Sequence, residues 1–315
     1  MHYEKFNTND GCKLAFQTSL PLNPLPTSTA SYSQCILLLH GFSGSSAYFT
    51  RNFSALSQHH WVVAPDIRGH GRSAHSKGGY HVARLAADLR ELLAHLRQTV
   101  GGAPAPRVFP VGCSIGAAVL WTYVELFGES DFAGFVFVDQ APLQDRSLFG
   151  AWDETKAHRG CYDEKSTLAA QEAWISRPEE TYRGLVAECL GYRCQPRGTD
   201  KVSEEEAKRD EEFFTGISAL CDGVWLARLL ADHTRYDHRE AIEGITKPTL
   251  VIAGRRSGCF PLAGIAETVE RIRKGGSGMD RKAEMSVFDS GHWLFYEEPE
   301  RFNKEVLAFA DRWAD

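Results

Sequence analysis

The sequence lacks any segment that would carry the chain into or across a membrane. Its first residues, MHYEKFNTNDGCKLAF, have neither the basic start nor the apolar stretch of a secretory signal. No apolar run approaches the roughly 20 residues that a membrane-spanning helix needs, and the final DRWAD is not a peroxisomal address. We therefore expect a soluble, cytoplasmic protein with no membrane partner.

Concentrated charge is also missing. The chain has 35 basic and 41 acidic residues, a net charge of −6, and no cluster of lysine and arginine. Nucleic acids and anionic membranes require such a basic patch, so both are excluded as partners. We expect a small-molecule partner, and the oligomeric state stays open.

Paired cysteine spacings are absent as well. Eight cysteines are scattered along the chain without a C-x-x-C motif. This argues against a zinc site and is typical of reduced thiols in a chain of this size. Cys189 and Cys194 are close enough in sequence to pair, but we expect free thiols.

The sequence does contain a regular alternation of strands and helices. Its 315 residues, 43% of them hydrophobic, can bury a full core. Short apolar runs that end in polar residues are typical of parallel strands buried on both faces, and they occupy 35–41, 61–66, 107–112, 134–139 and 249–254. Helical patterns cover 83–98 and 115–127. The prediction is an α/β fold with a mostly parallel sheet, helices on both faces, and a site at the carboxyl ends of the strands.

About a hundred residues interrupt this alternation after Asp139, too many for a loop. Helical patterns cover 164–176, 178–190, 203–214 and 216–233. We predict a helical cap at 143–244 over a core formed by 1–142 and 245–315. The aromatic residues of the cap are candidates for lining a pocket, although packing among cap helices is the alternative for each. They are Trp152, Tyr162, Trp174, Phe213, Phe214 and Trp225.

Candidate catalytic residues follow two of the strands. GCSIG at 112–116 matches G-x-S-x-G between a strand and a helix, which predicts Ser114 as a nucleophile on a strained turn. HGFSGSS follows the first central strand, and the backbone N–H groups of Phe42 and Ile115 are predicted to form an oxyanion hole.

A serine nucleophile needs a general base, because its hydroxyl is protonated at neutral pH. Among twelve histidines, His292 has the chain order, nucleophile first and histidine last, that this architecture requires.

Together the motifs HGFSGSS, PDIRGHGRS, GCSIG and SGHWLFYEEPERF resemble those of the α/β-hydrolase fold family. The resemblance implies an eight-stranded sheet, a cap after the sixth strand, a Ser-acid-His triad, and neither metal nor organic cofactor. The cap segment weakly resembles fungal proteins labelled non-haem chloroperoxidases.

The usual acid of this family is missing here. It would follow the seventh strand, where the chain has Ser257. Asp139 follows the strand after that of Ser114, so its side chain is predicted to emerge close by, and some members of the family carry the acid at this place. The alternative for Asp139 is that it shapes its loop, as an aspartate there does in relatives whose acid follows the seventh strand, and Asp289 or a cap carboxylate would then be the acid. We expect Ser257→Ala to have little effect.

These residues predict a cofactor-free serine hydrolase that cleaves an ester, lactone or thioester of a small organic substrate through an acyl-enzyme. Trp152, Phe213, Phe214, Trp225 and Trp293 are the candidates for substrate binding. The alternatives are a ligand-binding receptor that has lost turnover, a C–C bond hydrolase or perhydrolase, and a lyase.

Overall fold

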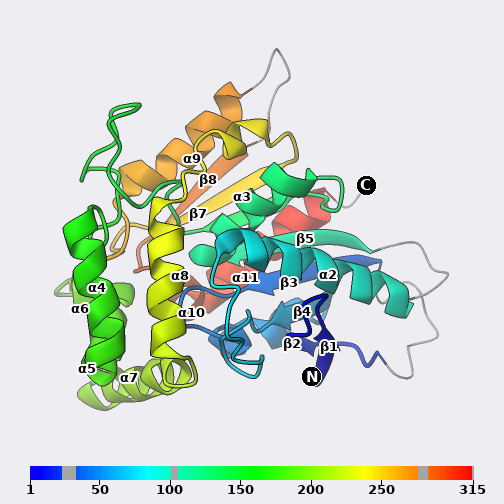
Figure 1. Ribbon diagram of the computed structural model, residues 1–315, viewed down its shortest axis with the longest axis horizontal. Helices are drawn as coiled ribbons and strands as arrows, with labels where there is room; N and C mark the ends of the chain where they lie inside the picture. The colour runs from blue at the N-terminus through cyan, green and yellow to red at the C-terminus, as the bar shows by residue number, and fades with distance from the viewer. Residues whose placement is uncertain (23–32, 101–105, 276–282, 314–315) are drawn as a thin grey trace.

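The computed structural model describes residues 1–22, 33–100, 106–275 and 283–313 and is built around one sheet of eight strands (Figure 1). The strands lie in the order β1-β2-β4-β3-β5-β6-β7-β8. β1 and β2 are antiparallel, β2 is antiparallel to β4, and the remaining neighbours are parallel. Their bounds are β1 His2–Asn7, β2 Lys13–Thr18, β3 Gln34–Leu39, β4 Trp61–Pro65, β5 Arg107–Cys113, β6 Phe135–Val138, β7 Thr249–Gly254 and β8 Ala283–Phe288.

Helices cover both faces of this sheet, as the doubly buried strands require. Figure 1 shows α2, α3 and α9 in front of the sheet and α11 behind it. Every residue of β4, β6 and β7 is buried, and Trp121 of α3 packs edge-to-face on Phe137 of β6 with ring centroids 5.4 Å apart. The bounds are α1 Phe53–Leu56, α2 Val82–Val100, α3 Ile115–Phe127, α9 Leu262–Lys274, α10 Leu294–Glu297 and α11 Pro299–Arg312, with 3-10 turns η2 Ser46–Arg51 and η3 Ala241–Gly244.

Five helices separate β6 from β7 and lie together at one end of the sheet, on the left of Figure 1. They are α4 Glu164–Ser176, α5 Pro178–Cys189, α6 Gly191–Cys194, α7 Glu204–Ser218 and α8 Gly223–Arg235. α4 packs against α8, and α5 against α7. They fall within 143–244, and we propose that this segment is a cap on a core formed by 1–142 and 245–315.

One helix expected from the sequence is divided in two. The pattern at 216–233 predicted a single helix, but α7 ends at Ser218 and α8 begins at Gly223. Asp222 caps α8 by accepting a hydrogen bond from the N–H of Trp225 at 2.7 Å. This cap satisfies one of the free donors of the new helix, so the chain turns there.

Among the described residues, no single helix has the length and apolar character to cross a bilayer, and only the sharply bent pair α7 and α8 passes that test when the two are taken together.

Candidate active site

Ser114 lies on the sharp turn between β5 and α3. Its backbone has φ 54° and ψ −124°, a conformation that costs free energy for a residue with a side chain. A Cβ at Gly112 would lie 2.7 Å from the nitrogen of Ala117, and one at Gly116 would lie 2.6 Å from the oxygen of Leu39. Both glycines are therefore required, because any side chain there would collide with neighbouring backbone.

The register of the sheet brings Asp139 beside this turn. Cys113 of β5 pairs with Val138 of β6. Ser114 directly follows Cys113, and Asp139 directly follows Val138. The N–H of Ser114 donates to the oxygen of Val138 at 2.9 Å, and the N–H of Asp139 donates to the oxygen of Ile252 at 2.8 Å. Adjacent parallel strands thus present both side chains at the same edge of the sheet.

His292 contacts Asp139 directly. Its Nδ1 lies 2.5 Å from Oδ2 of Asp139, and both side chains are buried. The other carboxylate oxygen, Oδ1, accepts the N–H of Gly254 at 2.8 Å. Asp139 itself has a positive φ of 46°. This contact occupies Nδ1 of the imidazole, so Nε2 is the ring nitrogen left for proton transfer.

Burial and charge act in opposite directions on this pair. Burial raises the pKa of Asp139 above its ordinary value, although the hydrogen bond and charge of His292 oppose the rise. Burial of His292 lowers its pKa, but the charge of Cys259 and the hydrogen bond to Asp139 outweigh burial, and the pKa is raised. The charge of Cys259 and the buried carboxylate of Asp139 therefore both favour a protonated imidazole at this position.

Ser257, which occupies the place of the expected acid, binds Asp139. Its Oγ donates to Oδ2 of Asp139 at 2.7 Å and accepts the N–H groups of Cys259 and Phe260, each at 3.3 Å. The side chain is buried. This contact gives Ser257 a role that the expectation of little effect for Ser257→Ala did not include, because the hydroxyl is one of three donors to the carboxylate.

We now expect Ser257→Ala to lower kcat/KM roughly 10- to 100-fold, because one hydrogen bond to a charged group contributes about 1.5–3 kcal/mol. The measurement is steady-state hydrolysis of p-nitrophenyl acetate. Ser290→Ala is the matched control: Ser290 is equally buried, and its Oγ has no hydrogen-bond partner among the described residues. Equal losses in the two variants would contradict a specific role for Ser257.

Asp289, the alternative acid, points elsewhere. Its side chain is 43% exposed and forms ion pairs with Arg197 and, at 3.6 Å, with Arg256. Nδ1 of His292 is already bound to Asp139. Of the candidate acids named from the sequence, Asp139 is the one that the structure brings to His292.

The backbone donors predicted for an oxyanion hole lie around Ser114. Ile115 is the first residue of α3, so its N–H has no partner within the helix and lies at the positive end of the helix dipole. Gly41 lies in the loop after β3, and a Cβ there would lie 3.2 Å from Cβ of Ser114. The loop therefore approaches Ser114 closely. Phe42 follows in that loop.

A cavity of about 320 Å³ connects these residues to the helices between β6 and β7. Ser114, His292 and Phe42 line it together with Trp293 and Trp174. The ring of Phe42 packs edge-to-face on Trp174 with centroids 5.2 Å apart. The volume is within the range of small-molecule sites.

Trp293 is the one residue of the five proposed for substrate binding that lines this cavity. The other four are not among the residues that line it, and their contacts lie elsewhere. Phe214 stacks on Trp293 with ring centroids 3.7 Å apart, and Phe213 stacks on Tyr296 with ring centroids 5.6 Å apart. These rings pack helix α7 onto the core.

The two remaining tryptophans are also packing residues. Trp225 covers Gly69, where a Cβ would lie 2.8 Å from the indole, and meets His70 edge-to-face at 5.6 Å. Trp152 is buried, with the guanidinium of Arg239 5.4 Å from its ring centroid. Both side chains therefore join loops and helices outside the cavity.

Sequence reasoning missed a pair of thiols in the cavity wall. All eight cysteines are free, and Cys189 lies against Cys259, with Sγ atoms 3.7 Å apart, instead of pairing with Cys194. The hydrogen bond from Cys189 lowers the pKa of Cys259 well below its ordinary value. Seventy residues separate the two cysteines, so no local spacing signals their contact.

Comparison with known proteins supplies the family. A family model described as alpha/beta hydrolase fold matches residues 34–299. The chain belongs to this family. An uncharacterized protein of Mycobacterium tuberculosis is 34% identical over 98 residues, which are 31% of this chain and only 27% of the relative. A pimeloyl-[acyl-carrier protein] methyl ester esterase of Vibrio vulnificus is 24% identical over 88% of this chain and 94% of the relative.

The fold of the alpha/beta hydrolase family extends over nearly the whole chain. An esterase from Exiguobacterium antarcticum superposes with a TM-score of 0.78 at 18% identity, covering 98% of both chains. The eight-stranded, mostly parallel sheet expected from the sequence motifs is therefore confirmed.

Proposed function

We propose that this alpha/beta hydrolase is a serine hydrolase that cleaves a carboxylic ester, lactone or thioester of a small organic substrate through an acyl-enzyme. The observation that carries the proposal is the 2.5 Å contact between His292 and Asp139 beside Ser114 in one cavity. The similarity over most of the chain to a protein named as a methyl ester esterase supports ester chemistry.

In the proposed reaction, Oγ of Ser114 attacks the substrate carbonyl while Nε2 of His292 accepts its proton. The N–H groups of Phe42 and Ile115 stabilise the oxyanion that develops. His292 then donates the proton to the leaving group, and a water molecule activated by the same histidine releases the acyl group. Asp139 holds the imidazole tautomer and stabilises the imidazolium.

The cavity wall favours an apolar acyl or alcohol group. Trp174, Leu185 and Phe260 contribute rings and an aliphatic side chain to it. Such a surface gains free energy by covering a hydrocarbon group, while Arg177, Glu180 and Glu188 also line the cavity. We propose uncharged esters of small organic acids as the substrate class, with no cofactor required.

Labelling with a fluorophosphonate tests the proposal, because the reagent reacts covalently with an activated serine. We expect stoichiometric labelling at Ser114, located by peptide mass spectrometry, and hydrolysis of p-nitrophenyl acetate with a burst of p-nitrophenol. A folded protein that showed neither reaction would contradict the proposal and favour a ligand-binding receptor. The main reason to consider a receptor was the absence of an acid after β7, where the chain has Ser257. The hydrogen bond between Ser257 and Asp139 weakens that reason.

A further inference from the structure

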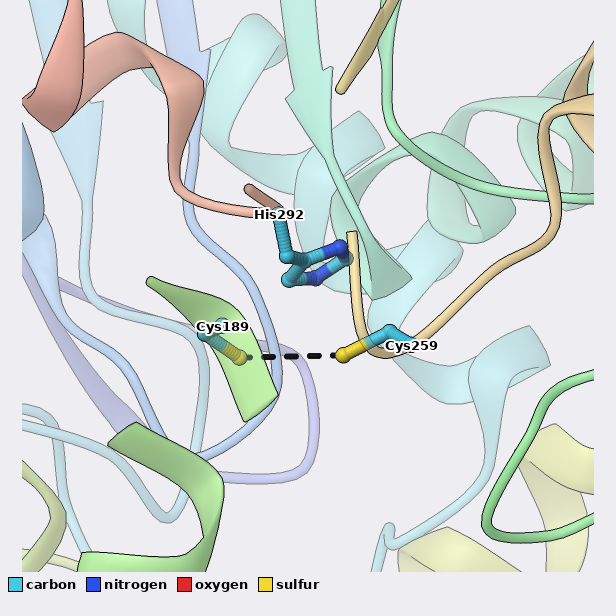
Figure 2. Close-up of side chains that lie close together, drawn as sticks. All are labelled: Cys189, Cys259 and His292. Atoms are coloured by element: carbon cyan, nitrogen blue, oxygen red, sulfur yellow. Dashed lines mark hydrogen bonds between the residues drawn. The ribbon is translucent and has the colours of Figure 1, made fainter. Parts of the chain in front are cut away.

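Three side chains that bind soft metal ions converge in the cavity wall: Cys189, Cys259 and His292. Their ligand atoms all lie within 4.8 Å of one another. Figure 2 shows the sulfur atoms of the two cysteines pointing toward each other beside the ring of His292. All three residues are buried from bulk solvent and line the cavity that contains Ser114, so a small ion can reach them through it.

The separation of the two sulfur atoms matches the geometry of a tetrahedral metal site. Two thiolates bound to zinc at about 2.3 Å with a tetrahedral angle lie about 3.8 Å apart. The Sγ atoms of Cys189 and Cys259 are 3.7 Å apart. An imidazole nitrogen in the same site lies about 3.6 Å from each sulfur, so the ligand nitrogen of His292 has to approach by at most about 1.2 Å from the 4.8 Å limit.

The imidazole already has the outer partner that metal-binding histidines use. Such histidines donate the second ring N–H to a carboxylate, which fixes the tautomer and raises the basicity of the ligating nitrogen. Nδ1 of His292 is bound to Asp139 at 2.5 Å. Nε2 is therefore the nitrogen left to ligate a cation, and Asp139 fits the outer position.

The backbone holds the two cysteines in place before any ion arrives. Cys189 is the last residue of α5, and its carbonyl accepts the N–H of Trp293 at 3.2 Å. The N–H of Gly258 donates to the carbonyl of Glu188 at 3.0 Å, which joins the loop after β7 to the same helix end. The three ligands thus belong to segments tied to one another by main-chain hydrogen bonds.

We propose that Cys189, Cys259 and His292 form a binding site for a thiophilic divalent cation of the zinc type, with water in a fourth position that faces the cavity. The expected consequence is reversible inhibition, because a cation on Nε2 takes the lone pair that accepts the proton of Ser114. That consequence rests on the proposed function, whereas binding of the cation does not. The spacing of the cysteines in the sequence argued against a zinc site. Only the fold brings Cys189 and Cys259 together.

Cadmium is the probe, since its bonds to thiolates give a charge-transfer absorption band in the ultraviolet. Titration of the reduced protein is expected to give one tight equivalent with this band, displaced by Zn²⁺. Cys189→Ser and Cys259→Ser should each weaken binding by more than the roughly 10–100-fold that loss of an outer-shell partner costs. Cys12→Ser is the matched control, because Cys12 is a buried free cysteine close to Ala74 and outside the cavity.

A second measurement needs no variant. Zn²⁺ should protect Cys189 and Cys259 of the unaltered protein from iodoacetamide, as mapped by mass spectrometry, and leave the labelling of Cys194 unchanged. Equal metal affinity in all three serine variants, or equal labelling of the pair with and without Zn²⁺, overturns the proposal. Binding without any esterase activity to inhibit would leave the metal site standing and would instead count against the proposed function.

Discussion

Asp139→Asn is expected to lower kcat for p-nitrophenyl acetate about 10⁴-fold, the loss that follows when the carboxylate of a Ser-His-acid triad becomes an amide. An amide donates as well as accepts, so it can favour the imidazole tautomer whose proton lies on the nitrogen facing Ser114. It also carries no charge to stabilise the imidazolium. The loss should appear in kcat, because Asp139 lies behind His292 and not in the cavity wall.

Asp289→Asn is the matched control for this change. It removes a carboxylate from the loop that follows β8, close to His292 in sequence, but its partners are the exposed Arg197 and the guanidinium of Arg256. Ion pairs of this kind contribute about 0–1 kcal/mol, so activity and melting temperature should change little. A severe loss in Asp289→Asn with a mild one in Asp139→Asn would place the acid after β8. Circular dichroism of each variant separates lost chemistry from lost folding.

Ser114→Ala is expected to have the largest effect on turnover, about 10⁶-fold in kcat. It removes the atom that forms the acyl-enzyme and leaves the backbone donors and the cavity in place. Alanine is close in size to serine and relieves no part of the strained φ of 54°, so the fold should be retained. Substrate binding should persist, because the rings of Phe42, Trp174 and Trp293 still line the cavity.

The pre-steady-state burst measures this change most directly. The parent should release one equivalent of p-nitrophenol rapidly, and Ser114→Ala should release none and take up no fluorophosphonate. A burst that survives in the variant would assign the nucleophile to another group. Cys259 is the first to test, since its thiol lines the same cavity and its pKa is lowered by Cys189.

The fold and the positions of Ser114 and Asp139 were accessible from the sequence because each depends on local pattern and sheet order, and His292 was accessible from its place after them in the chain. Buried strands give continuous apolar runs, and parallel strands end at one edge. An aspartate directly after the strand next to that of Ser114 therefore has to lie near it. In the structure, Cys113 pairs with Val138, so the next residues, Ser114 and Asp139, lie side by side.

The cavity wall was not accessible in the same way. Whether an aromatic side chain on a helix faces a cavity depends on how that helix is rotated against its neighbours, and the sequence of α7 does not encode this alone. Phe213 and Phe214 follow each other in sequence, and both pack onto aromatic residues of the core. The role of Ser257 and the contact between Cys189 and Cys259 likewise depend on long-range packing.

The hydroxyl of Ser257 and the imidazole of His292 meet the same carboxylate oxygen of Asp139, at 2.7 and 2.5 Å. Two neighbouring strand ends thus reach one point, and a carboxyl group placed on either would serve the same histidine. A chain carrying both carboxyl groups would let them share a proton, so the acid could be moved from one strand end to the other without a step that lacks it. Serine suits the end of β7, since it is small and donates a hydrogen bond to the carboxyl group of Asp139.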